Sequence, residues 1–144
     1  MSILFLLTLL LHTAGSPPGD SEYVRVSASV SPAVVAPGDS LTILIRFEPA
    51  DDIHITMDPQ ALIEPDSSAP MHPVGSTVVT ADDRSGYLRT AVPIRRTLVA
   101  VKGATPGDHQ ITGHTTYFYC SDAEGWCRRS RQPFSLRVTI VEHH

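Results

Sequence analysis

Apolar residues in this chain recur at every second position, in short runs that begin near residue 23. Such alternation is typical of a β-strand with one buried face, whereas a helix would show a period of 3.6. The pattern predicts that two sets of side chains face the core: Leu41, Ile43, Ile45 and Phe47 in one run, and Leu136, Val138 and Ile140 in another. Both runs are therefore expected to be strands.

Clusters of Pro, Gly, Asp and Ser separate these runs, and together they predict seven strands, at 23–31, 40–48, 53–57, 76–80, 88–101, 109–120 and 134–141. Two gaps place Pro before Gly, at Pro37-Gly38 and Pro106-Gly107, as expected where a chain turns through a positive φ. Residues 58–73 are rich in proline and are predicted to be an irregular surface connection, and residues 81–86 an exposed loop. The fold class predicted is all-β, an immunoglobulin-like two-sheet antiparallel β-sandwich.

The amino terminus reads differently from the rest of the chain. Residues 3–11 are almost entirely hydrocarbon but too short to span a bilayer, and small residues follow them. We therefore expect residues 1–15 to be a signal peptide, with cleavage after Ala14 or Gly15, and residues 16–144 to form a single sandwich domain. The mature chain is expected to have no transmembrane segment and to be periplasmic or secreted.

The net charge and the absence of known motifs exclude several classes of function. The formal net charge of −4 excludes the strongly basic face that nucleic-acid binding requires. The sequence holds no Gly-x-Ser-x-Gly motif and no phosphate-binding glycine loop, so no cofactor and no hydrolase chemistry are predicted. Four histidines raise the alternative of metal binding with the cysteines, but their spacing gives no ligand pair and we assign no metal site: His54, His72, His109 and His114.

The chain has two cysteines, Cys120 and Cys127, on either side of a predicted hairpin turn. In an exported protein such a pair is expected to be oxidised to a disulfide. A ring of about eight residues removes only about 2.5 kcal/mol of denatured-state freedom on the chain-entropy model, so it would be a modest staple. The pair is expected at one end of the domain, where a partner thiolate can reach it. Thiol-disulfide exchange is therefore the alternative to a purely structural disulfide.

Side chains around the pair could dock a partner protein or change the stability of a cysteine thiolate. Arg128, Arg129 and Arg131 would favour the thiolate, whereas Asp122 and Glu124 would oppose it. An aromatic run at 117–119 together with Trp126 suggests a docking collar. The candidates for docking or tuning are Tyr119, Trp126, Arg128 and Arg129.

Residues 119–127, with the sequence YCSDAEGWC, resemble the active hairpin of the amino-terminal periplasmic domain of the DsbD thiol:disulfide interchange proteins. Residues 34–47 and 53–55 resemble early strands of the same family. The resemblance implies an immunoglobulin-like fold with Cys120 and Cys127 as the catalytic pair, relaying electrons between thioredoxin-like or membrane-embedded oxidoreductases. It also implies that Cys127 forms the mixed disulfide and that Cys120 resolves it.

In that family a cap loop covers the disulfide, and residues 82–87 or 66–73 could serve here. The function expected is therefore a periplasmic thiol-disulfide exchange module. The alternative is a non-catalytic secreted β-sandwich that binds a protein or envelope component, with a purely structural hairpin disulfide.

Overall fold

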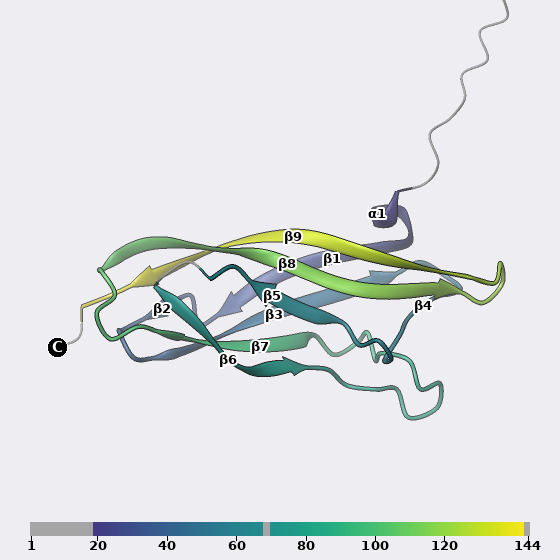
Figure 1. The fold of residues 1–144 in the computed structure, drawn as a ribbon, viewed down its shortest axis with the longest axis horizontal. Helices are drawn as coiled ribbons and strands as arrows, with labels where there is room; N and C mark the ends of the chain where they lie inside the picture. Colours follow the sequence, from purple (N-terminus) through teal and green to yellow (C-terminus); the bar gives the residue numbers. More distant parts are fainter. Residues whose placement is uncertain (1–18, 68–69, 143–144) are drawn as a thin grey trace, which may run out of the picture.

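The structure is a computed structural model that describes residues 19–67 and 70–142, so the expected signal peptide lies outside the described residues. Two β-sheets stack face to face, and a one-turn helix precedes the first strand (Figure 1). The elements in chain order are α1 (Asp20–Tyr23), β1 (Val24–Ser31), β2 (Val34–Val35), β3 (Ser40–Pro49), β4 (Ile53–Ile55), β5 (Leu62–Pro65), β6 (Met71–Val78), β7 (Ile94–Ala100), β8 (Gly107–Ser121) and β9 (Trp126–Ile140). Within these ranges no helix is long and apolar enough to cross a membrane.

The order of the strands gives the fold class. One sheet runs β1-β3-β7-β6, and the other runs β2-β9-β8-β4 with β5 also paired to β8. If β1 with β2 and β4 with β5 are each counted as one interrupted strand, this is the seven-strand order of an immunoglobulin sandwich. All strand pairs are antiparallel except β2 with β9. The predicted all-β, immunoglobulin-like two-sheet sandwich is confirmed.

The core lies where the alternation placed it. Every core position predicted in β3 is at most 3% exposed, and Val138 and Ile140 of β9 are at 1%. Leu136 is only partly buried but packs against the same cluster. The rings of Phe47 and Tyr117, 4.9 Å apart, join the two sheets. Aromatic packing thus links β3 to β8, the two strands whose counterparts in antibody domains are joined by the disulfide between the sheets.

The prediction of an irregular surface connection at 58–73 is wrong. This segment contains β5 and the start of β6, and Ala61 and Ile63 in it are fully buried. Its prolines concealed the strands in the sequence, yet Pro65 ends β5 and Pro73 lies on β6, an edge strand. Proline is tolerated at such positions because no ladder hydrogen bond is lost there.

Other strand limits also differ from those predicted. Of residues 88–101 only Ile94–Ala100 is a strand, and Leu88 instead forms an isolated bridge with Ala81. The last strand starts at Trp126 rather than at 134, and β8 and β9 are each 15 residues long. The early half of β9 was missed because polar and charged residues occupy both of its faces between Arg128 and Gln132.

Two glycines have the positive φ that the turn motifs predicted, Gly38 at 88° and Gly107 at 127°. Another glycine, Gly113, allows a close crossing in the middle of β8. A Cβ built there would lie 2.5 Å from the Glu64 carbonyl oxygen and 2.7 Å from Cζ of Phe134. The helix α1 was not expected, and its four residues place Asp20 and Tyr23 beside the β8–β9 hairpin.

Candidate functional site

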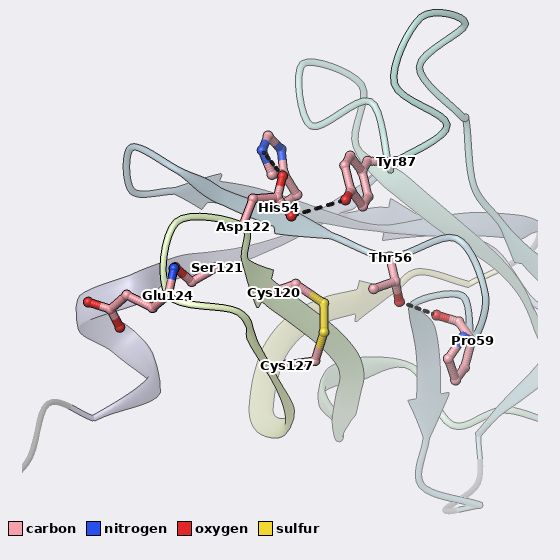
Figure 2. Close-up of a disulfide and its surroundings, with 9 residues drawn as sticks. All are labelled: His54, Thr56, Pro59, Tyr87, Cys120, Ser121, Asp122, Glu124 and Cys127. Carbon is pink, nitrogen blue, oxygen red and sulfur yellow. Dashed lines mark hydrogen bonds and ion pairs between the residues drawn. A yellow bond between two sulfur atoms is a disulfide. The ribbon is translucent and has the colours of Figure 1, made fainter.

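The two cysteines form a disulfide that links β8 to β9 one residue pair before the hairpin turn (Figure 2). Cys120 and Cys127 stand directly opposite each other in the ladder, with Cα atoms 4.0 Å apart. Residues directly opposite in an antiparallel pair project to the same face of the sheet. The expected disulfide is confirmed, and both half-cystines lie on one face.

The turn between the cysteines is held by its own hydrogen bonds. The Gly125 N–H donates to the Ser121 carbonyl over 2.8 Å, and the Glu124 N–H donates to Ser121 Oγ over 3.1 Å. Gly125 has a φ of 74°, in the left-handed region that glycine enters at no steric cost. The turn is therefore closed by contacts that do not depend on the sulfur atoms.

The two faces of the sheet have different exposure at this end. Tyr117 and Tyr119 point between the sheets and are 0% exposed. Cys120 alternates with them and so lies on the outer face, where it is 8% exposed. Cys127 is exposed. The disulfide is therefore on the outside of the sandwich, with Cys127 as its accessible half.

Trp126 and Arg128 lie on the inner face, away from the disulfide. The Arg128 guanidinium stacks over the Trp126 ring at 4.4 Å, and Tyr23 meets Trp126 edge-on at 5.0 Å. Because Arg128 is engaged there, the expectation that it tunes a thiolate at Cys127 is not met by this geometry. The Tyr119 side chain is fully buried, so the suggestion that it forms part of a docking collar is wrong.

A carboxylate from α1 completes the inner cluster. Asp20 accepts hydrogen bonds from the Tyr119 hydroxyl over 2.5 Å and from Ser130 Oγ over 2.9 Å. Burial, together with the bond to Asp20, raises the pKa of Tyr119 to about 12. This cluster anchors α1 against the hairpin and is a structural feature.

Arg129 and Arg131 are the arginines that share the outer face with the disulfide. Arg129 stands opposite Phe118 and Arg131 opposite Thr116, and both arginines are exposed. Within 19–67 and 70–142 neither is in an ion pair. Of the arginines predicted to favour a thiolate, these two are on the correct face.

A histidine from β4 lies beside Cys120 on the outer face. Cys120 of β8 pairs with His54 of β4 on one side and with Cys127 of β9 on the other. The three residues therefore form a row across β4, β8 and β9. The His54 Nε2 atom is 3.3 Å from an Asp122 carboxylate oxygen in the hairpin turn. The ring also stacks on Tyr87, with centroids 4.6 Å apart and planes within 8°.

The Tyr87 hydroxyl donates to the other Asp122 oxygen over 3.2 Å, which closes the cluster shown in Figure 2. The negative charge of Asp122 raises the pKa of Tyr87 above its usual value. From the sequence, Asp122 was expected only to oppose a thiolate, and Tyr87 only to belong to a candidate cap loop. Their meeting with His54 depends on pairing between distant strands, for which the sequence has no local signal.

The two candidates for a cap loop lie in different places. Residues 82–87 reach the hairpin through Tyr87, and Asp82 fixes the loop by accepting the N–H groups of Arg84 and Ser85, each over 3.0 Å. These bonds lower the pKa of the Asp82 carboxyl. The other candidate, 66–73, is wrong as far as it is described, because Asp66 bonds to Thr112 in the first half of β8.

The four histidines do not come together. His54 is on β4, His72 on β6, and His109 and His114 on β8. Among the residues that the structure describes, no group of three or more His, Cys, Asp or Glu side chains is placed to hold a metal ion.

No protein-family model matches the chain, and no curated protein matches it. Among solved structures it is similar to AggA, the major subunit of aggregative adherence fimbriae type I from Escherichia coli. The identity is 8%, the TM-score is 0.42, and the alignment covers 82% of this chain and 95% of that one. A likeness at this level decides neither fold nor function, and the fold assignment above rests on strand order alone.

Proposed function

We propose that this disulfide-bonded β-sandwich binds a protein partner through its β8–β9 hairpin end and exchanges the Cys120–Cys127 disulfide with thiols of that partner. The observation that carries the exchange is the exposure of Cys127 on the outer face, next to a buried Cys120. A partner thiolate must reach one sulfur in line with the bond, and here only the Cys127 half is open to such an approach.

The weakness of the disulfide as a staple also supports exchange. The bridge joins two strands that already pair over 15 residues each, and the turn beyond it is closed by its own hydrogen bonds to Ser121. The constraint it adds is that of a ring of about eight residues, about 2.5 kcal/mol on the chain-entropy model. A bond with so modest a structural contribution can be opened without unfolding the domain.

Exchange of this kind matches the resemblance to the amino-terminal domain of the DsbD proteins. On that basis the compartment is the periplasm, and the partners are thioredoxin-like or membrane-embedded oxidoreductases. Attack at the exposed Cys127 agrees with the role that the resemblance gives this residue.

In the second candidate function, the chain binds a partner through the same hairpin end but does not exchange its disulfide. In it the chain is a non-catalytic module whose disulfide only holds the hairpin. The observation in its favour is that side chains fix the hairpin end on both faces, Tyr23 against Trp126 on one and Tyr87 against Asp122 on the other. Binding to a partner requires only such a rigid surface. Both candidate functions therefore include partner binding, and they differ only in whether the disulfide is exchanged.

The reduction potential of the pair separates the two candidates. The domain is equilibrated with dithiothreitol or glutathione buffers while free thiols and circular dichroism are recorded. Exchange requires a potential above about −250 mV and reduction of the folded domain. A value below about −300 mV, with thiols appearing only on unfolding, would leave the binding module.

A further inference from the structure

We propose that the free edge of β1 pairs with β1 of a second copy of this chain, so that two four-stranded sheets join into one. The inference goes beyond the function proposed above and does not depend on disulfide exchange. It is carried by a contrast between the edges of the two sheets. Among the strands that the structure describes, β1 alone gives an edge that is long, regular and without a feature that blocks further pairing.

The other sheet edges each carry a feature that limits pairing with another chain. In the same sheet, β6 holds Pro73, and its register shifts between Val74 and Val78. In the other sheet, the edge beside β8 is divided between β4 and β5, of three and four residues. The remaining edge is β9, beyond the two residues of β2, and it carries several arginines and Pro133. Prolines, bulges, short strands and charges are the means by which sheet edges avoid pairing.

The edge of β1 has almost none of these features. Its eight residues pair with β3 without a break in register and include no proline, no glycine and one charged residue, Arg25. Within the described ranges, no backbone hydrogen bond joins residues 25–31 to any strand other than β3. At the edge of an antiparallel sheet, half of the N–H and C=O groups point away from the paired neighbour. In β1 these groups are therefore available to another strand.

Side chains at this edge are also incompletely covered. Val26, Ala28 and Val30 pack against the core cluster but are only partly buried. A groove opens beside Val26 and Ala28, and its opposite wall is formed by Pro133 and Phe134 of β9. A strand added to the edge of β1 would cover more of these apolar side chains and so gain hydrophobic stabilisation.

A second copy of β1 fits this edge by its own pattern. When two copies pair antiparallel around Ala28, residues at equal distances from Ala28 stand opposite each other and on the same face of the sheet. On the core side, Val26 of each copy then meets Val30 of the other. The apolar row of one sheet continues into the next without a polar interruption.

The outer face of β1 is equally compatible with itself. Its residues are exposed, and in the same register Ser27 of one copy meets Ser29 of the other. Arg25 stands opposite Ser31, so the two arginines lie at opposite ends of the paired segment. Like charges directly opposite would destabilise the pair, and here none meet. This complementarity in polarity and charge is the reason for assigning the edge to a second copy.

The pairing closes on itself and leaves the hairpin end free. Each chain offers one such edge, so two copies satisfy each other and a third cannot add to them. The strand β1 begins beside the β8–β9 hairpin, where Tyr23 packs against Trp126. Because the two copies of β1 run in opposite directions, the dimer would carry one hairpin at each of its two ends.

Analytical ultracentrifugation of the purified chain, from low to high micromolar concentrations, tests the pairing. A single pair of strands is a small interface, at the weak end of specific association. The weight-average mass is therefore expected to rise with concentration from that of one chain to about twice that value, and no further. Amide hydrogen exchange gives a second readout, because the outward N–H groups of residues 25–31 should become protected over the same range.

Paired substitutions on the outer face test the register. Ser27→Lys with Ser29→Lys places lysines opposite each other in two rows and is expected to weaken the dimer by about 10-fold. Ser27→Lys with Ser29→Glu places opposite charges in the same rows and is expected to restore it. Both serines are exposed, so the variants should keep the fold, which circular dichroism checks. His72→Lys with Ser76→Lys, on exposed positions of the edge strand β6, is the matched control and should dimerise like the wild type.

A wild-type chain that stays monomeric over this range would overturn the proposal. A dimer that persists unchanged in the double-lysine variant would do the same, because the interface would then lie elsewhere. Equal weakening in the double-lysine and the lysine–glutamate variants would rule out pairing around Ala28. Should a variant not fold, hydrogen exchange of the wild type decides, since protection of residues 25–31 that does not change with concentration refutes the pairing. None of these results bears on disulfide exchange, which the reduction potential tests.

Discussion

The two faces of the hairpin end carry different kinds of side chain. On the inner face, Tyr117 and Tyr119 are fully buried, and an α1 carboxylate satisfies the Tyr119 hydroxyl. On the outer face, Cys127 is exposed and His54 is half-exposed beside Asp122. Because successive residues of a strand alternate between these faces, one short sequence supplies both the packing that holds the hairpin and the groups available to a partner. Stability and chemistry should therefore respond to different substitutions.

The largest effect is expected on the inner face. Tyr117→Ala removes a ring that joins the two sheets through Phe47 and leaves a cavity, with an expected loss of about 3–5 kcal/mol in the free energy of unfolding. Urea unfolding followed by circular dichroism measures this loss. Tyr117→Phe is the control, since the Tyr117 hydroxyl has no hydrogen-bond partner among the described residues. A small loss in Tyr117→Ala would show that the sheets are held together elsewhere.

Removal of the disulfide tests the outer face. The double variant Cys120→Ala, Cys127→Ala is expected to lose at most about 2.5 kcal/mol, because the ring is short and the ladder remains. It should stay folded and lose all thiol exchange with a partner dithiol. Unfolding of this variant at 25 °C would contradict the comparison of the two faces and favour a structural disulfide.

Tyr119→Phe removes the hydrogen bond to Asp20 and is expected to cost about 1.5 kcal/mol near neutral pH. It should also change the alkaline behaviour. The pKa of Tyr119 is about 12 in the folded chain against an ordinary 10.0, so the neutral hydroxyl stabilises the fold fully below pH 10. That stabilisation is lost as the pH rises from 10 to 12.

Urea unfolding at several pH values between 9 and 12 measures the slope of stability against pH. Part of the wild-type slope comes from Tyr87 and Tyr117, whose pKa values are also raised. Tyr119→Phe should lose only its own share. Identical slopes in wild type and variant would show that the pKa of Tyr119 is the same in the folded and unfolded states.

The smallest effect on stability is expected at the outer cluster. Asp122→Asn weakens exposed contacts with His54 and Tyr87 and should cost less than about 1 kcal/mol. The pKa of Tyr87 should fall back toward its ordinary value, since the charge of Asp122 is what raises it. Absorbance titration of the tyrosines measures this shift, and Asp83→Asn, away from the hairpin turn, is a suitable control.

The sequence by itself predicted most of the fold. Alternation in β3 identified its four buried residues correctly, and each of the two Pro-Gly pairs marked a turn in which the glycine has a positive φ. These signals are local, because a buried face imposes its period on one strand whatever its partner is. The hairpin between Cys120 and Cys127 was predicted for the same reason, since both of its strands adjoin the turn in sequence.

Only the tertiary structure decided what surrounds the disulfide. It placed Arg128 on the inner face with Trp126, brought His54 beside Cys120, and carried Tyr87 to the turn. It also found strands in the proline-rich segment, where Ile63 is buried against β8 and the core. The positions of His54, Tyr87 and Ile63 depend on contacts between segments distant in the chain. A shift of one residue would turn every side chain of a strand to the other face, so no local pattern could fix them.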